Sequence, residues 1–592
     1  MSKRHDARPK SSRYHQCCYL RSVSKLSKPR RSAPTTTIFR RGANPLQRRI
    51  SWRRRWHPLW ALPVLLAASL GVLAGVHTPK IRGRWVELQE AHFQLFSNAD
   101  PAETEHFAQR LVRFRQVFSQ LLPGFQQPST KSTRIYLFRR ASSFKHFANL
   151  LGAPGKIDAL FVATKPVNFI LVLMDKHSDS AGLLYHEYLH EVVAETASDI
   201  PLWLNEGLAE FFSTFWSNGS QAEVGLANPD YLYLLRSEPR LDFRHLLSVA
   251  PRSPDYREPG PKSLFHAQSW LLVHYLITSG IDLRTVIPAY REHIVAGMEP
   301  AAAFAMALST DETGLARALV AHLALKPLPS LKIHIKGAGR TQIGNTRPMA
   351  REEIFFRFGE LLSIAARHRA PEAEAYLHAA LATNPNHEPA LAALAALLTR
   401  EGRGEEARAI LARARTQAPD DPSLLYLEGN RLLQPFLAQL ANKSPSREHC
   451  PEAVRQAREA YFQAVTLQPE AREAYAGIAR SCLFGPPDDP ICAQEFGIAR
   501  HRFPGDGEIA YLHMRFLLRQ GRRDDARERL DELRRAAPAS PWIARGEKIL
   551  ATSQQEGTLL GPARSALGGR ELLADRLRLG RVRPELDEPL KV

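Results

Sequence analysis

Four residues between positions 183 and 212 have the types and spacing that a metal-dependent hydrolase requires. His186, Glu187 and His190 form an H-E-x-x-H pattern, and Glu206 follows after a break. Residues four apart lie one turn above each other on the same face of a helix, so both imidazoles can face one ion. Glu187 lies one step around that helix, where a carboxylate can act as a general base on a water at the metal. The pattern predicts a zinc site.

Two histidines are too few ligands for a catalytic zinc ion, which usually takes three protein ligands and keeps a fourth position open. Pro201 breaks the first helix, and Trp203 and Leu204 restart an apolar period. Glu206 then falls near the start of a second helix. From that position its carboxylate can reach the same ion.

The run HEYLH followed by WLNEGLAEFF resembles the gluzincin metallopeptidases, and in detail their peptidase-MA-like bacterial domains. This resemblance implies an α+β zincin-like (thermolysin-like) fold and a Zn²⁺ ion held by His186, His190 and Glu206. It also implies that Glu187 is the catalytic base, and that Glu210 accepts the outer N–H of a ligand histidine, which would fix the tautomer of that ring. The implied activity is hydrolysis of peptide bonds by an endopeptidase or an aminopeptidase-like enzyme.

A later helical stretch, FHAQSWLLVHYL over 265–276, matches a motif like YAQSW in the resembling domains. Gluzincins use a Tyr or His from beyond the metal helices to donate a hydrogen bond to the developing oxyanion. Here His266 stands at the tyrosine position. It is the candidate catalytic donor, and a purely structural role in its helix is the alternative. His274 and Tyr275 are further candidates for the same role.

The segments before the metal helix alternate between strand and helix periods, as a mixed α and β domain would. They cover 85–97, 101–122, 134–138, 141–151 and 169–174. A sheet leading into an H-E-x-x-H helix is the general zincin arrangement, in which an edge strand can bind extended substrate. Mostly helical sequence follows. We predict a peptidase domain over 82–325 and a linker rich in Pro, Gly and basic residues over 326–348.

The last third of the chain is a repeat array. Prolines that each follow a helix rich in Ala, Leu and Arg recur at Pro385, Pro419, Pro469, Pro504 and Pro538. A period of 34 residues with this proline resembles the tetratricopeptide repeat, which stacks helix pairs into an all-α solenoid with a concave surface. We predict such an array over 349–554, followed by a tail of uncertain order over 555–592. Peptides or partner proteins are the expected ligands, and a spacer without ligands is the alternative.

The N-terminal region predicts membrane attachment. Residues 1–57 hold 17 of the 80 Lys and Arg but one of the 60 acidic residues, so the basicity is local and a nucleic-acid partner is not expected. This arm has no apolar period and should be disordered. An uncharged apolar run then predicts a transmembrane helix over 58–77. By the positive-inside rule the arm stays in the cytoplasm. A cleaved signal peptide is the alternative.

Cysteine use agrees with export. Cys450, Cys482 and Cys492 lie beyond the predicted span, where an oxidising compartment permits one bridge, and Cys482 and Cys492 are the nearest pair.

Together these features predict a zinc metallopeptidase anchored by a single span in a bacterial inner membrane, with the bulk of the chain periplasmic. Its repeats would recruit the protein substrate or a partner. The alternative is a non-catalytic or weakly active repeat scaffold for protein–protein interaction at the cell envelope, which His266 in place of tyrosine favours.

Overall fold

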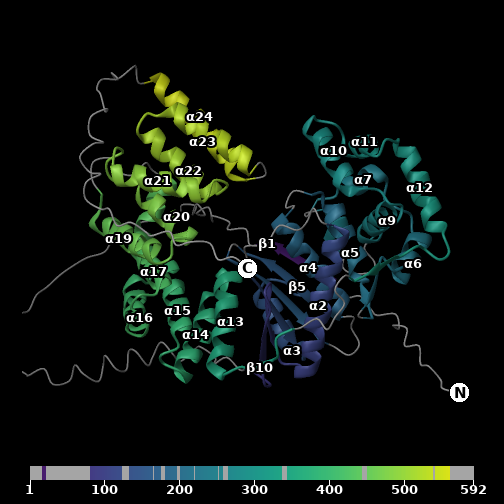
Figure 1. Cartoon of the computed structure of the whole chain (residues 1–592), viewed down its shortest axis with the longest axis horizontal. Coiled ribbons are helices and arrows are strands. Elements are labelled where there is room, and N and C mark those ends of the chain that lie inside the picture. Colours follow the sequence, from purple (N-terminus) through teal and green to yellow (C-terminus); the bar gives the residue numbers. More distant parts are fainter. Residues whose placement is uncertain are drawn as a thin grey trace, which may run out of the picture. The chain divides into compact units, whose positions relative to one another are not determined.

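The computed structural model describes residues 16–21, 81–122, 132–155, 157–164, 166–174, 180–196, 200–218, 220–250, 253–257, 264–335, 343–442, 450–537 and 540–559 (Figure 1). The chain forms two compact units, and the boundary between them follows Pro435. The first unit contains the candidate metal site.

A mixed sheet is the centre of the first unit. In the described part of the chain it has seven strands in the order β1-β5-β6-β4-β3-β2-β10. Parallel pairs are β3/β4, β4/β6 and β1/β5, and antiparallel pairs are β5/β6, β2/β3 and β2/β10. Their bounds are β1 Gln16–Arg21, β2 Val86–Gln89, β3 Phe93–Ser97, β4 Ser132–Phe138, β5 Ile157–Ala163, β6 Val167–Leu173 and β10 Arg347–Pro348.

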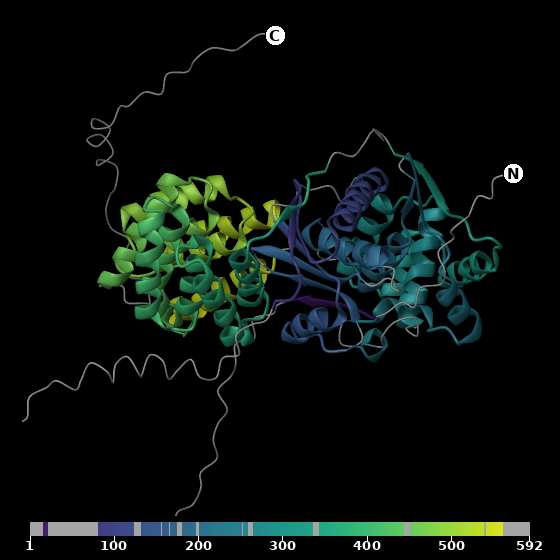
Figure 2. The same ribbon diagram turned by 90° about the horizontal axis from the view of Figure 1, so that it is seen from below.

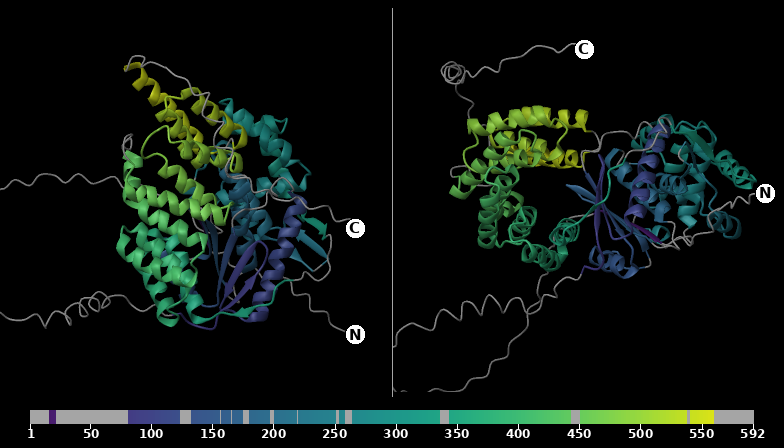
Figure 3. Two further views of the ribbon diagram at one scale, coloured as in Figure 1. Left: turned by 60° about the vertical axis from the view of Figure 1, so that its left-hand side comes forward. Right: turned by 60° about the horizontal axis from the view of Figure 1, so that its bottom comes forward.

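The central strands are apolar on both faces because both faces are covered. Every residue of β6 is buried, as expected for a strand between two layers. On β4, alternate side chains join different cores, since Ile135 packs on one face and Tyr136 on the other. The strands also twist progressively across the sheet (Figure 3).

One face of the sheet is covered by the helices that carry the predicted site. They are α2 (Pro101–Leu121), α4 (Ser180–Thr196), α5 (Leu202–Ser213) and α9 (Leu264–Thr278). Further elements of this side are α6 Pro229–Ser237, α7 Phe243–Ser248, α8 Pro254–Arg257, α10 Leu283–Val295, α11 Pro300–Ala307 and α12 Glu312–Ala324, with a small antiparallel sheet of β7 Trp216–Ser217, β8 Gln221–Val224 and β9 Leu331–His334.

The other face is covered by α3 (Ala141–Leu150) and by the first helices of the repeat array, α13 (Arg351–Ala365) and α14 (Ala370–Thr383) (Figure 2). The rings of Phe147 and Phe358 stack at 4.1 Å, and Trp85 meets Phe358 edge-on at 5.2 Å. The structure therefore differs from the predicted separation of peptidase domain and array, because α13 completes the core of the sheet. The predicted linker over 326–348 also contributes β9 and β10 to the two sheets.

The C-terminal region is a helical solenoid of tetratricopeptide type, as predicted. Consecutive helices pack in pairs, for example α15 with α16 and α22 with α23. The second helices of the pairs end two residues before the predicted prolines, at Thr383, Gln417, Leu467, Arg502 and Ala536. The bounds are α15 Glu388–Arg400, α16 Gly404–Gln417, α17 Pro422–Leu433, α18 Leu437–Asn442, α19 Glu452–Leu467, α20 Arg472–Ser481, α21 Pro490–Arg502, α22 Gly507–Arg519, α23 Arg523–Ala536 and α24 Trp542–Leu559.

A disulfide joins Cys482 to Cys492 and spans the connection between α20 and α21, while Cys450 is a free thiol. The bonded pair is the one nearest in sequence. The corresponding connections between α15 and α16 and between α22 and α23 are shorter, so the bridge closes a turn that is enlarged relative to these repeats.

The N-terminal arm differs in part from its prediction as a disordered segment. Residues Gln16–Arg21 form β1, which pairs in parallel with β5. The unpaired backbone groups of an edge strand favour such an addition by any extended segment. None of the described helices is long and apolar enough to cross a membrane, and the span predicted over 58–77 lies outside the described residues.

Candidate metal centre

The two histidines of the H-E-x-x-H pattern come from the middle of α4. The helix is held against the sheet by apolar neighbours of the histidines, including Leu184, Tyr188 and Leu189, all of which are buried. Its opposite face turns His186 and His190 toward α5, and both rings are buried as well, at 4% and 2% exposure. The helical spacing therefore places both imidazoles on one face, as predicted.

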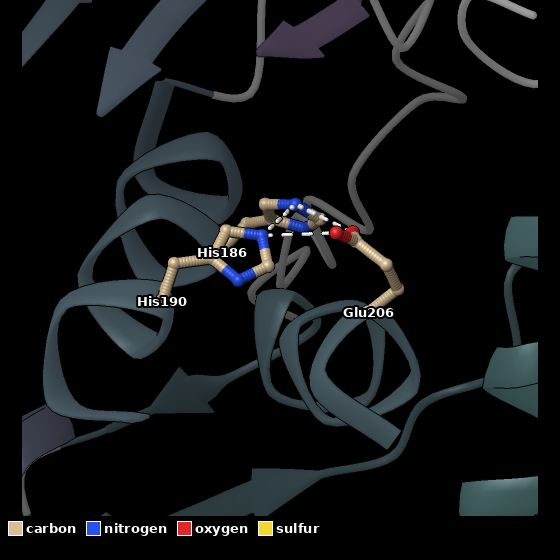
Figure 4. A group of neighbouring side chains, drawn as sticks. All are labelled: His186, His190 and Glu206. Carbon is tan, nitrogen blue, oxygen red and sulfur yellow. Dashed lines mark hydrogen bonds and ion pairs between the residues drawn. The ribbon is translucent and has the colours of Figure 1, made fainter. Parts of the chain in front are cut away.

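The third predicted ligand meets the two histidines (Figure 4). The Nε2 atoms of His186 and His190 lie 3.0 Å apart. The Oε2 atom of Glu206 lies 3.7 Å from the first and 3.5 Å from the second. Among the described residues this trio is the one group of His, Cys and acidic side chains whose ligand atoms converge in this way. Ligands that share one zinc ion at bond lengths near 2 Å must lie within about 4 Å of each other, and these three do.

Close packing of α5 on α9 brings Glu206 into place. Gly207, the next residue, lies so near α9 that a Cβ atom would stand 2.4 Å from the carbonyl oxygen of Ser269 and 2.5 Å from Val273. A side chain at this position would force the two helices apart. The glycine of the Asn-Glu-Gly sequence therefore sets the distance between α5 and α9.

The electrostatics of the trio fit a cation between its atoms. Burial lowers the pKa of His186 to about 3, so this imidazole is neutral. Burial would also lower the pKa of His190, but the Glu206 carboxylate outweighs it and raises that pKa to about 9. Burial disfavours the charged form of Glu206, yet His190 holds the pKa of Glu206 well below its usual range. The Glu206 carboxylate thus favours positive charge beside it, and a divalent ion that takes the place of the His190 proton would supply that charge.

Outer partners orient both ligand rings from their Nδ1 side. The Nδ1 atom of His190 lies 3.0 Å from Oδ1 of Asn205, and Nδ1 of His186 lies 3.5 Å from Oε1 of Glu210. An acceptor at Nδ1 leaves the Nε2 lone pair directed toward a metal. Glu210 therefore lies where the resemblance implied. Burial raises its pKa to about 8.

Glu187, the predicted general base, is fully buried on α4 beside the two ligands. Its charge is close enough to favour the protonated form of His190. A carboxylate in so dry a setting interacts strongly with nearby protons and charges.

His266 enters the site from α9. Its Nε2 lies 3.6 Å from Oε2 of Glu206, and its side chain keeps 18% exposure, more than the ligands have. His274, one of the other candidates, points elsewhere: its ring contacts Nε2 of His322 at 2.8 Å and the carbonyl oxygen of Gly225 at 3.0 Å. Tyr275 lies beside His322. Of the three candidates, only His266 therefore reaches the predicted site.

Tyr256 is a site residue that the sequence analysis missed. Its hydroxyl donates to Oε1 of Glu206 at 3.1 Å, and its ring stacks on His266 at 5.7 Å. It belongs to α8, a single short turn in a Pro- and Arg-rich stretch without periodicity, so no sequence signal identifies it. Asn205 was also missed, although it directly precedes Glu206.

Comparisons with known proteins concern the repeats. Residues 365–430 match the family model described as tetratricopeptide repeat. No curated protein matches the chain.

Three solved structures illustrate the similarity. YrrB, a TPR protein with an unusual peptide-binding site, is 17% identical over 33% of this chain and 90% of its own, with a TM-score of 0.24. TTC0263, a thermophilic TPR protein from Thermus thermophilus, is 20% identical over 34% of this chain and 99% of its own, with a TM-score of 0.28. The pilF protein of Pseudomonas aeruginosa is 15% identical over 36% and 93%, with a TM-score of 0.27.

The family match shows tetratricopeptide repeats in the C-terminal region, a scaffold for protein–protein interaction. It lies outside the segment that carries the metal trio, whose zinc binding stays a prediction.

Proposed function

We propose that this protein is a zinc-dependent metallopeptidase at the extracytoplasmic side of a membrane, with repeats that recruit its substrate or a partner protein. The observation that carries the proposal is the buried convergence of His186, His190 and Glu206 within 3.0 to 3.7 Å. A structural zinc site is usually closed by four protein ligands, whereas a catalytic one has three and keeps a position open. Three converging side chains in the described part of the chain favour the catalytic type.

In this proposal, zinc would act when bound as a Lewis acid on the scissile carbonyl and on the attacking water. Glu187 takes a proton from that water and afterwards delivers it to the leaving amine. His266 and Tyr256 lie on the α8 and α9 side of Glu206, where an N–H and an O–H can donate to the carbonyl oxygen as negative charge develops. Tyr256 places a phenol beside His266, at the position where the resembling domains have a tyrosine, and this weakens the sequence argument against turnover.

Substrate access is supported by the edge of the sheet. The outer backbone groups of β5 pair with an extended segment of this chain, β1. If the arm lies across the membrane, as a span over 58–77 requires, this edge is open, and a peptide substrate in extended conformation is its expected ligand.

Location on the exported side is supported by the Cys482–Cys492 disulfide, since such bonds persist in oxidising compartments. A single span over 58–77 would put β1 and β5 on opposite sides of the membrane, so that span and the β1–β5 pair exclude each other. The strongly basic arm favours the span, with the arm in the cytoplasm. Labelling of Cys17 and Cys18 by a membrane-impermeant maleimide, in a Cys450→Ser background, tests this. We expect labelling only after the membrane is permeabilised.

The decisive experiment is metal analysis of the purified full-length chain together with cleavage of an unfolded protein substrate by the wild type and by Glu187→Gln. We expect one zinc per chain in both proteins and cleavage by the wild type alone. Absence of stoichiometric zinc, or equal cleavage by both proteins, would refute the proposal.

The second candidate is a repeat scaffold without turnover, which the tetratricopeptide match favours. A cellular phenotype that survives Glu187→Gln but is lost on deletion of 436–592 would support the scaffold over the enzyme.

A further inference from the structure

A buried polar contact joins α4, the helix of the two histidines, to the sheet behind it. Glu191 directly follows the ligand His190 on α4 and points toward the sheet. Its Oε1 accepts a hydrogen bond of 2.6 Å from Oγ1 of Thr133 on β4. Both residues are buried, at 3% and 0% exposure. Burial of a carboxylate destabilises the folded state unless the carboxylate is hydrogen-bonded, so the bond from Thr133 stabilises Glu191 in the interior.

The alternation of β4 places Thr133 on the face that meets α4. It lies on the same side of the strand as Ile135 and Leu137, which belong to the core beneath the metal helix. Its backbone is fixed from both sides, because β4 pairs with β3 at Phe93 and with β6 at Asn168. The hydroxyl is thus presented from a rigid central strand.

A second polar group from outside α4 acts beside this contact. Burial lowers the pKa of Arg115 on α2, while the nearby charge of Glu191 opposes that change. The guanidinium of Arg115 also donates to the hydroxyl of Tyr188 and lies 5.3 Å from the centre of its ring. Tyr188 lies two residues before His190 on α4 and Glu191 lies one residue after it, so α4 is held by other elements on both sides of this ligand.

The contact has a geometric consequence for the metal site. Successive helix residues are rotated by about 100°, so a hydrogen bond that fixes the direction of Glu191 also fixes that of His190. Apolar contacts alone are non-directional and tolerate small rotations. A ligand set loosens when the groups that support it can shift by about 1 Å.

We propose that Thr133 and Glu191 are positioning residues that fix the rotation of α4 about its axis and so hold His190 on the metal. This inference rests on the proposed function, because the ligand concerned is the zinc ion. It concerns metal affinity and not proton transfer, so its test does not depend on turnover.

The test compares zinc dissociation constants, measured on the full-length chain by competition with a chromogenic chelator. Thr133→Val keeps the shape of the side chain and removes the hydrogen bond. The matched control is Thr104→Val, which makes the same change at another fully buried threonine of this domain, one that bonds to Ser97 and Asp100. Thr133→Ser restores the hydroxyl.

We expect Thr133→Val to weaken zinc binding by about 10-fold, the lower end of the range for loss of a group bonded to a ligand, because Thr133 acts on His190 only through Glu191. Thr104→Val and Thr133→Ser should bind zinc as tightly as the wild type, because neither change removes the hydrogen bond to Glu191. Equal affinity in Thr133→Val and Thr104→Val overturns the inference, as does a serine variant as weak as the valine variant. If Thr133→Val does not fold, Glu191→Met, which removes the acceptor, replaces it with the same expected direction, and unchanged affinity there overturns the inference.

The two proposals fail in different ways. A wild-type protein without stoichiometric zinc overturns the proposed function and this inference with it. A wild type that binds zinc and cleaves its substrate, beside a Thr133→Val variant of equal affinity, overturns the positioning role alone.

Discussion

Gly207→Ala is the sharpest test of how the fold places the third ligand. The new Cβ would stand 2.4 Å from the carbonyl oxygen of Ser269, and ordinary contact begins at 3.4 Å. The backbone of α9 cannot rotate away as a side chain could, so α5 and α9 must separate by about 1 Å. Overpacking of this kind typically costs about 1 to 3 kcal/mol of unfolding free energy.

The same displacement reaches the site, because His266 lies one turn before Ser269 on α9 and contacts Glu206 at 3.6 Å. We expect Gly207→Ala to lower the thermal unfolding midpoint and to lower kcat for peptide cleavage. Zinc binding should weaken as well, since Glu206, the ligand next to Gly207, moves with α5, while the histidines of α4 stay in place. Differential scanning fluorimetry, metal analysis and a fluorogenic protein substrate measure the three effects.

The matched control is Gly497→Ala on α21, where an added Cβ meets no atom within 4 Å. At such an open helical position alanine is favoured over glycine by roughly 0.5 to 1 kcal/mol, so this variant should melt at or above the wild-type temperature. If Gly207→Ala melts like Gly497→Ala and keeps full activity, the close approach of α5 and α9 does not position the site.

Three further predictions follow from the site and the sheet. Tyr256→Phe should lower kcat by roughly 100-fold, the cost of losing one oxyanion donor, while its zinc content stays unchanged. Steady-state kinetics that match the wild type would show that Tyr256 does not donate. Removal of zinc by a chelator should lower the thermal unfolding midpoint, because an ion that binds only the folded state stabilises that state. Excess zinc should restore the midpoint. A midpoint that does not respond to chelation contradicts a buried metal site. A chain that ends at Pro348 should be insoluble, because it lacks α13, which covers the face of the sheet around Phe147. A chain that ends at Pro435 should fold, because it keeps the compact first unit. Circular dichroism that shows both truncations folded would refute the structural role of the first repeat.

The local patterns of the sequence predicted the two helices that carry the site, α4 and α5. The four-residue spacing of His186 and His190 depends only on the helical period, and Pro201 separates α4 from α5. The repeat array was foreseen for the same reason, because each helix pair is a contiguous unit with its own period. The boundary between the peptidase domain and the array was not foreseen, since α13 has the amphipathic pattern of any repeat helix whether it packs on a neighbour or on a sheet.

The sequence by itself therefore determined the features that depend on contiguous residues. These are one helix with two imidazoles on one face, a nearby carboxylate on the next helix, and a helical repeat. Tertiary structure alone decided the rest. It brought Tyr256 to Glu206 and His266, joined Thr133 to Glu191, and covered the sheet with α13. These contacts join residues far apart in the chain, and their formation depends on how whole helices and strands pack. A helical or strand period specifies which face of an element is buried, but not which distant element covers it.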